Sequence, residues 1–282
     1  MNNKTTIITI NYNNLEGLKK TIDSVVNQTW KEFEYIVIDG GSTDGSVAYI
    51  ENQSDIIDYW VSEPDNGIYN AMNKGIKVAS GEYLLFLNSG DHLFDTEILS
   101  KCNSYLDLHD LVTFNIQMIE DKKERIVCYP DKFRFSNLFD NGLCHQSTFI
   151  KNTLFNTIGL YDENLRFVSD WKFFILALFK YQSSYLKVNE TLTTYYLDGI
   201  SSDFANRAIL VKEKKQVLEE YFSPYVLDYE ELLINREIVK TNRHKILIEI
   251  EKTFFGKKIM SLFLSVYVIL FSKKKLKKIT NN

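Results

Sequence analysis

The first ninety residues repeat one pattern, in which a short apolar run ends in a polar, turn-forming segment with an acidic residue. The clearest runs, with the aspartates that follow them, are Tyr35–Ile38 with Asp39, Tyr59–Val61 with Asp65, and Tyr83–Leu87 with Asp91. Ligands of open α/β sheets bind beyond the carboxyl ends of the strands. The three aspartates, with Asp44 nearby, are therefore predicted to meet at one rim of a sheet. Crowded carboxylates repel, so we expect a cation or a donor-rich ligand to offset them.

Helical segments alternate with these strands. Thr5–Ile10 predicts a first strand, and apolar residues recur at helical spacing over Asn14–Gln28. Two further helices are expected at about Ser46–Asn52 and Asn66–Ala79. Strands and helices that alternate through short loops are typical of a parallel sheet with right-handed crossovers, so the expected fold class is α/β.

The residues after Asp95 predict a different arrangement. A helix to about Leu108 precedes two strand-like runs, Leu111–Ile119 and Arg125–Tyr129, joined by a charged turn that is typical of a hairpin. This pattern predicts an antiparallel extension of the parallel sheet. The remaining expected elements are a strand at Gln146–Ile150, an apolar helix at Trp171–Tyr181, and a long charged helical region from about Asp203 to Phe255.

Composition narrows the class of protein. The chain has 282 residues, 45% hydrophobic and 14% aromatic, which is enough for one large domain or a domain with an appendage. Its three cysteines, Cys102, Cys128 and Cys144, show neither CxxC spacing nor an even count, so we expect reduced thiols and no zinc site. Thr5–Ile10 is too short for the apolar core of a signal peptide, and a cytoplasmic protein is expected.

Charge is distributed unevenly along the chain. Residues 252–282 contain eight lysines and no acidic residue, whereas the rest has 25 basic against 37 acidic residues. The acidic body argues against a nucleic-acid-binding protein. In the tail, the largely apolar run Ile259–Phe271 lies between lysines. At 13 residues, it is shorter than the roughly 20 that span a bilayer. This predicts peripheral contact with an anionic membrane, with a docked core helix and a solvated lysine tail as the alternative.

Four motifs follow one another in the first half of the chain. They are Thr9–Asn13, Asp39–Ser46, Asp65–Gly75 and Leu87–Asp91. Together they resemble the GT-A fold family 2 glycosyltransferases, the inverting enzymes of bacterial polysaccharide assembly. The resemblance is specific over roughly residues 5–95, continues more loosely to Ser201 and then fades. It implies a GT-A catalytic domain over residues 1–202, followed by a helical extension over residues 203–282.

The resemblance implies a site for a nucleotide-sugar donor. Tyr12 would stack on a uracil-like base, and Asp39 and Asp65 resemble the family residues that accept hydrogen bonds from the base and the ribose. Lys74 would face the diphosphate as a point charge, and a solvated helix lysine is an equal alternative. The full set of residues implied to bind the donor is Thr9, Asn11, Tyr12, Asp39, Asp65, Lys74 and Asn88.

Asp91 matches the last acidic residue of the family's metal motif, so the resemblance implies a divalent cation, Mg²⁺ or Mn²⁺. Such a cation would bridge the protein and the two phosphates and offset charge on the leaving nucleoside diphosphate. This chain has Asn88 and Gly90 where relatives often have acids. Because Mg²⁺ keeps several waters, one carboxylate and an amide oxygen can still hold it. We therefore expect weaker metal dependence than in acid-rich relatives.

Inverting transfer needs a base that takes the proton of the acceptor hydroxyl. Asp170, within Ser169–Trp171, matches the family's base position, with a helix N-cap as the alternative. His145, just before a predicted strand, is a candidate to contact the acceptor, the donor phosphates or the metal, and a core histidine is its alternative. Trp171 is a further candidate contact with the acceptor or donor. Gly199–Ser202 resembles a loop that closes over the donor in relatives.

The implied reaction moves a hexosyl or N-acetylhexosaminyl group from a nucleotide, with UDP favoured over GDP and dTDP, to a hydroxyl of a surface glycan or lipid-linked saccharide. A dinucleotide-dependent oxidoreductase is excluded because no glycine-rich fingerprint follows the first strand. A sugar nucleotidyltransferase is excluded because its glycine- and arginine-rich loop is missing there. A non-catalytic, glycosyltransferase-like binding or scaffold protein is the other reading, and the presence of both Asp91 and Asp170 argues against it.

Overall fold

The computed structural model describes residues 5–120, 123–139, 142–197, 206–225, 228, 231, 234 and 238–271. The chain divides into two compact units, residues 1–217 and residues 218–282. Over the described ranges of the first unit, nine strands form one sheet in the order β3-β2-β1-β4-β8-β6-β9-β5, with β7 paired to β6.

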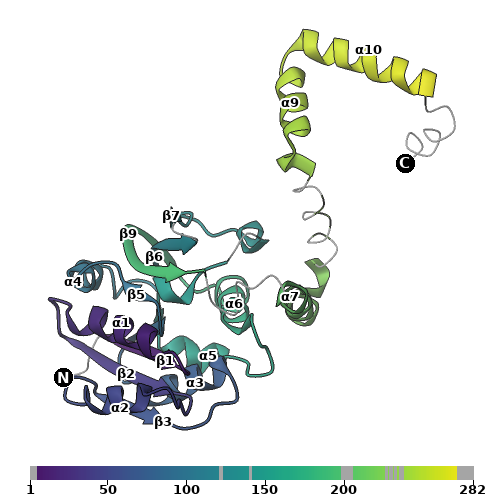
Figure 1. The fold of residues 1–282 in the computed structure, drawn as a ribbon. Coiled ribbons are helices and arrows are strands. Elements are labelled where there is room, and N and C mark those ends of the chain that lie inside the picture. The colour runs from purple at the N-terminus through teal and green to yellow at the C-terminus, as the bar shows by residue number, and fades with distance from the viewer. Residues whose placement is uncertain are drawn as a thin grey trace. The chain divides into compact units, whose positions relative to one another are not determined.

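The first half of the sheet is parallel, as predicted (Figure 1). β1 pairs with β2 on one side and with β4 on the other, and β3 lies beyond β2. Helices connect these strands in turn. The bounds are β1 Thr5–Asn11, α1 Leu15–Val26, β2 Phe33–Asp39, α2 Ser46–Glu51, β3 Tyr59–Ser62, α3 Ile68–Val78 and β4 Tyr83–Asn88. The predicted α/β class is therefore confirmed.

The second half of the sheet is largely antiparallel. β6 (Leu111–Glu120) and β7 (Lys123–Val127) form the predicted hairpin. β8 (Thr148–Lys151) is antiparallel to both β4 and β6. The long strand β9 (Tyr185–Tyr196) is parallel to β6 and antiparallel to the short β5 (His92–Leu93). β9 was not predicted, although its β-branched and aromatic residues favour a strand.

The helices of this region differ in their bounds from the predicted ones. The expected helix from Asp95 to Leu108 is limited to α4 (Ile98–Asn103), and α5 (Thr153–Ile158) follows β8. The predicted Trp171–Tyr181 helix begins earlier, as α6 (Ser169–Ile175), and continues as a π-helical turn, Leu176–Lys180. α7 spans Arg207–Phe222, and single 3₁₀ turns occur at Phe135–Phe139, His145–Ser147 and Ser223–Tyr225.

Both faces of the parallel strands are buried, because side chains alternate along each strand. In β1, Ile8 packs with Met72 of α3, whereas Ile7 packs on the opposite face with Leu18 of α1. Gly75 allows α3 to approach closely, since a Cβ there would lie 2.6 Å from Ile8 Cγ2. With both faces covered by helices, the carboxyl ends of the strands are where this part of the fold can present polar groups to a ligand.

The second unit contains α9 (Asn242–Glu251) and α10 (Phe254–Phe271). Large apolar side chains of α10 are exposed, for example Phe254 at 77% and Phe263 at 70%. No helix in the described part of the chain has both the length and the apolarity to cross a membrane. The predicted loop Gly199–Ser202, the predicted boundary at residues 202 and 203, and the lysines after Phe271 lie outside the described residues.

Candidate functional site

Asp39 ends β2 in a net of hydrogen-bond donors. Its Oδ1 accepts from Asn11 Nδ2 (2.7 Å) and Ser42 Oγ (2.6 Å). Its Oδ2 accepts from the backbone N–H groups of Gly41 and Ser42 and from Ser62 Oγ (3.1, 2.8 and 2.6 Å). Burial of this carboxyl would raise its pKa, but the hydrogen bonds from Ser42, Ser62 and Asn11 outweigh burial and lower the pKa. Direct contact between Asp39 and a nucleotide stays a prediction. For such a contact, one of the protein groups that donate hydrogen bonds to Asp39 would first have to turn away.

Asp44 holds the starts of two helices. Its Oδ2 accepts from the backbone N–H of Leu15 at 2.8 Å, and its Oδ1 accepts from the N–H and hydroxyl of Ser46 at 3.1 and 2.7 Å. The hydroxyl bond from Ser46 is the main reason that the pKa of Asp44 is lowered. The protein's own donors thus offset Asp39 and Asp44. This corrects the expectation that these two carboxylates need a cation or a ligand to balance them.

Asp65 and Tyr12 approach each other across the end of β2. A Cβ at Gly40 would lie 3.0 Å from Asp65 Oδ2 and 3.1 Å from Tyr12 Cδ2, so a glycine here allows both side chains to come close. The ring of Tyr12 is 68% exposed and available for stacking. Lys74 Nζ lies 2.5 Å from Asp65 Oδ1 and 2.9 Å from Glu63 Oε1, so its ammonium is already paired.

The two predicted donor contacts on β1 differ in their placement. Thr9 is fully buried, and its Oγ1 lies 3.1 Å from the hydroxyl of Tyr35 in the core. Its side chain is therefore directed away from the rim, which corrects the expectation that it contacts the donor. Asn11 is at the rim, bonded through Nδ2 to Asp39, and its buried Oδ1 has no hydrogen-bond partner among the described residues.

Asn88 ends β4, and Asp91 lies in the tight turn that follows, where its N–H donates to the carbonyl of Asn88 at 2.9 Å. The hydroxyl of Thr21 in α1 donates to the carbonyl of Asp91 at 2.6 Å and accepts from the N–H of Gly90 at 3.0 Å. Gly90 has a φ of 111°, a conformation that disfavours any side chain. The conformation of this turn therefore favours glycine at position 90.

This turn could hold a divalent cation only if a bound ligand supplied further oxygen atoms to the coordination. No group of three His, Cys, Asp or Glu side chains suited to a metal occurs in the described part of the chain. Asn88 Oδ1, however, is a buried oxygen that lacks a hydrogen-bond partner among those residues, and Asp91 is only 6% exposed. An amide oxygen and one carboxylate suit Mg²⁺ or Mn²⁺ when phosphate oxygens and waters complete the coordination.

Asp170 lies at the first turn of α6 and draws its partners from several elements. Its Oδ1 accepts from the hydroxyl of Tyr69 in α3 and from the N–H of Trp171, both at 2.9 Å. Its Oδ2 is 2.9 Å from Nδ1 of His145. Burial would raise the pKa of Asp170, but the hydrogen bond and charge of His145 and the bond from Tyr69 outweigh burial and lower the pKa. Asp170 therefore stays ionised at neutral pH.

His145 connects this centre to the turn after β4. While Nδ1 faces Asp170, Nε2 lies 3.4 Å from Asn88 Nδ2. The imidazole is 8% exposed, and its ring packs edge-on against Phe86 of β4. A continuous series of contacts therefore runs from Asn88 through His145 to Asp170. Trp171, 5% exposed, is adjacent to this series, and its Nε1 has no hydrogen-bond partner among the described residues.

Three residues of this region were not predicted from the sequence. Tyr69 lies within a motif that was identified, but nothing in that motif indicates contact with Asp170. Glu213 and Lys214 belong to the charged helix α7, where the sequence gives no reason to separate them from solvated neighbours. Glu213 accepts from the N–H groups of Arg166 and Phe167, and Lys214 lies over the ring of Trp171.

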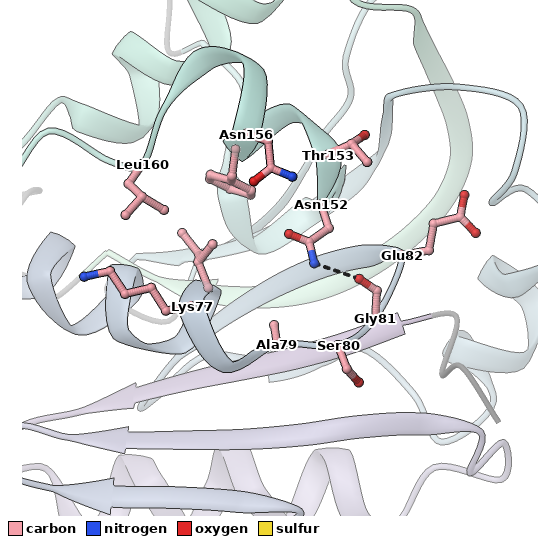
Figure 2. A pocket seen from close by; sticks show the side chains of 11 residues that line it. Lys77, Ala79, Ser80, Gly81, Glu82, Asn152, Thr153, Asn156 and Leu160 are labelled. Carbon is pink, nitrogen blue, oxygen red and sulfur yellow. Dashed lines mark hydrogen bonds between the residues drawn. The ribbon is translucent and has the colours of Figure 1, made fainter.

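A separate cavity of about 720 Å³ lies near the opposite end of β4 (Figure 2). Its lining includes Gly81 and Glu82, just before β4, and Asn152, whose Nδ2 donates to the carbonyl of Gly81 at 3.0 Å. None of the predicted site residues lines this cavity. Volume alone therefore does not identify the site, whereas the strand ends bring the motifs together.

The sequence profile of glycosyl transferase family 2 matches residues 6–151, just over half of the chain, and the chain belongs to this family. An uncharacterized glycosyltransferase of Mycobacterium tuberculosis is 34% identical over 176 residues, which are 61% of this chain and 67% of that protein. A PGL/p-HBAD biosynthesis glycosyltransferase of Mycobacterium bovis is 31% identical over 170 residues, 55% of this chain and 62% of that protein. The match therefore spans less than two thirds of the second relative.

Two solved structures are similar in fold. Staphylococcus aureus TarS in complex with UDP-GlcNAc superposes with a TM-score of 0.59 at 18% identity, covering 79% of this chain and 72% of TarS. The mannosyltransferase PcManGT from Pyrobaculum calidifontis, in complex with GDP-Man and Mn²⁺, gives a TM-score of 0.59 at 13% identity, covering 96% of this chain and 88% of that one. The predicted GT-A fold is confirmed.

Proposed function

We propose that this glycosyltransferase is an inverting enzyme that transfers a hexosyl or N-acetylhexosaminyl group from a nucleotide sugar to a hydroxyl of a surface glycan or lipid-linked saccharide. The observation that carries the proposal is the contact series from Asn88 through His145 to Asp170. It joins the turn of the donor motif to the carboxylate of the base motif. UDP is the favoured nucleotide of the donor, consistent with the UDP-GlcNAc bound to TarS. GDP is the alternative, because PcManGT binds GDP-Man.

The donor would bind at the carboxyl ends of β1, β2 and β4. The exposed ring of Tyr12 suits stacking with the base. The buried Oδ1 of Asn11, which has no hydrogen-bond partner within the described ranges, suits an N–H or O–H group of the nucleotide. Asp65 lies beside Tyr12 with its charge balanced by Lys74. Asp39 accepts five hydrogen bonds from protein groups and so holds the strand ends and the turn of this rim together.

Asp170 would act as the base. As the acceptor oxygen attacks the anomeric carbon, its proton passes to the Asp170 carboxylate, and the bond from that carbon to the diphosphate oxygen breaks. The nucleoside diphosphate leaves with the bonding electrons. Tyr69 and His145 hold the carboxylate in place, and His145 and Trp171 line the approach to the acceptor or donor. When bound at Asp91 and Asn88, Mg²⁺ or Mn²⁺ would offset charge on the departing diphosphate.

The exposed apolar side chains of α10, with the lysines around it in the sequence, favour contact with an anionic membrane surface. We therefore place the enzyme in the cytoplasm, peripheral on the inner face of the cell membrane, where a lipid-linked acceptor would be presented. Sedimentation with vesicles tests this placement. Binding to vesicles rich in phosphatidylglycerol but not to pure phosphatidylcholine vesicles is expected, and equal recovery in the supernatant with both would contradict it.

Calorimetric titration tests the catalytic proposal. The protein is titrated with UDP, GDP and dTDP, each with Mn²⁺ and with EDTA, and Asp91→Ala is measured in parallel. We expect one nucleotide to bind best, more tightly with Mn²⁺, and this gain to be lost in Asp91→Ala. If no nucleotide binds under any condition, the transferase proposal fails and a scaffold function takes its place.

A further inference from the structure

Lys214 places a positive charge beside the candidate base. Its Nζ lies 5.0 Å from the centre of the Trp171 ring, and Trp171 directly follows Asp170. The backbone of α7 is tied to this region by the neighbouring residue, because the carboxylate of Glu213 accepts from the N–H groups of Arg166 and Phe167 at 2.8 and 3.0 Å. Glu213 is only 7% exposed, so Lys214 is carried on a well-anchored turn of the helix.

Two carboxylates close to Lys214, in Glu213 and Asp170, are committed to other partners. Glu213 is used by two backbone amides, and both oxygens of Asp170 are used by Tyr69, Trp171 and His145. Within the described residues, Lys214 forms no ion pair and no hydrogen bond. Its side chain is partly buried, and burial lowers the pKa of the ammonium, whereas the charge of Asp170 opposes that shift. A cation in this position gains from an anionic ligand.

The surroundings suggest which anion this is. Lys214 contacts Trp171, which adjoins Asp170, and Asp170 reaches Asn88 through His145. The ammonium is thus close to the base, and the contacts of His145 connect the base to the donor turn. Asp91 is the one carboxylate in the sequence 88–91, so this turn offers few carboxylates for a cation that would neutralise phosphate charge. A lysine is well suited to supply such charge directly.

We infer that Lys214 is a binding residue for a phosphate group, carried either by the nucleotide-sugar donor or by a phosphate-linked acceptor. This inference rests on the proposed function and adds a residue to its site. Loss of one charge-assisted contact to a phosphate weakens binding by about 10- to 100-fold.

The test is calorimetric titration of Lys214→Met and Lys214→Arg, with Lys212→Met as the control. Lys212 lies on the same helix and is exposed. The probes are UDP, GDP, inorganic pyrophosphate and farnesyl phosphate, each with Mg²⁺. Weaker binding of the nucleotides and pyrophosphate to Lys214→Met assigns the donor phosphates. Weaker binding of farnesyl phosphate alone assigns the acceptor. Lys214→Arg and Lys212→Met should keep most of the wild-type affinity in either case.

The failures of the inference and of the proposed function are distinguishable. If the wild-type protein binds nucleotide and Lys214→Met binds every probe equally well, the inference fails and the proposed function stands. If the wild-type protein binds none of the probes, both fail. Should Lys214→Met not fold, amine acylation of the wild-type protein followed by mass spectrometry decides the matter. A saturating probe that binds should slow acylation of Lys214, and unchanged acylation with every bound probe overturns the inference.

Discussion

The carboxylates of the parallel half of the sheet and the carboxylate of Asp170 obtain their hydrogen-bond partners in different ways. In the parallel half, Asp39 and Asp44 are satisfied by donors at the ends of neighbouring strands and by the turns that follow them. Around Asp170, by contrast, the partners come from α3, from the turn at His145 and from α6 itself. Strand ends of a parallel sheet thus form a site through regular geometry, whereas the base centre depends on tertiary packing of distant segments.

Asp170→Asn separates the two regions most strongly. Removing the base should lower the transfer rate by about 10²- to 10⁴-fold, while nucleotide affinity stays unchanged because Asp170 itself is not proposed to contact the nucleotide. Steady-state kinetics with the preferred nucleotide sugar, together with calorimetry, measures both. The exposed Asp55→Asn is the control and should behave like the wild type. Loss of nucleotide affinity in Asp170→Asn would mean that the two regions are not separate in function.

Asp39→Asn should show that the rim of the parallel half is also a structural element. Five donors face its carboxylate, and an amide cannot accept from all of them, so we expect a loss of about 2–4 kcal/mol in the free energy of unfolding. Because the pKa of Asp39 is lowered in the folded protein, its stabilisation is complete above the unfolded pKa of about 3.9. It is lost as the pH falls through the folded pKa.

Urea unfolding of the wild type and of Asp39→Asn at neutral and at acidic pH measures this effect. The difference between the two proteins should be full at pH 7, where Asp39 is ionised in both folded and unfolded chains. It should shrink below about pH 4. A difference that is independent of pH would show that the hydrogen-bonded charge of Asp39 is not the source of the stabilisation.

Glu213→Gln probes how α7 is anchored to the region around Asp170. The variant keeps one acceptor oxygen but loses the charge that two backbone amides share, so a loss of about 1–2 kcal/mol in unfolding free energy is expected. Thermal or urea unfolding measures it, with the exposed Glu220→Gln of the same helix as the control. Equal stabilities of the two variants would contradict the anchoring role.

Lys74→Met is expected to give the smallest effect. Since Asp65 and Glu63 already hold the ammonium, and their hydrogen bonds raise its pKa against the opposing effect of burial, we expect nucleotide affinity to change by less than about 3-fold. Calorimetry compares this variant with Lys214→Met. An affinity loss as large as that of a phosphate-binding lysine would show that Lys74 turns from Asp65 to the diphosphate on binding.

The same contrast explains what the sequence could predict. The strands of the parallel half are apolar runs bounded by turns, so their positions and the aspartates at their ends follow from local pattern. Thr9 was misplaced because it precedes the end of β1: it lies on the same face as Asn11, but deeper, where its side chain meets Tyr35 in the core. Tyr69 and Lys214 could not be assigned, since their roles arise from contacts with Asp170 and Trp171 that lie far away in sequence.

The most direct test of the account is the location of the bound nucleotide. Hydrogen–deuterium exchange with and without UDP and Mn²⁺, or whichever nucleoside diphosphate binds, compares the carboxyl ends of the strands with the cavity at the opposite end of β4. Protection is predicted at residues 11–14, 39–46, 63–68 and 88–92. Protection confined to residues 76–82 and 152–160, which include the lining of that cavity, would contradict the account.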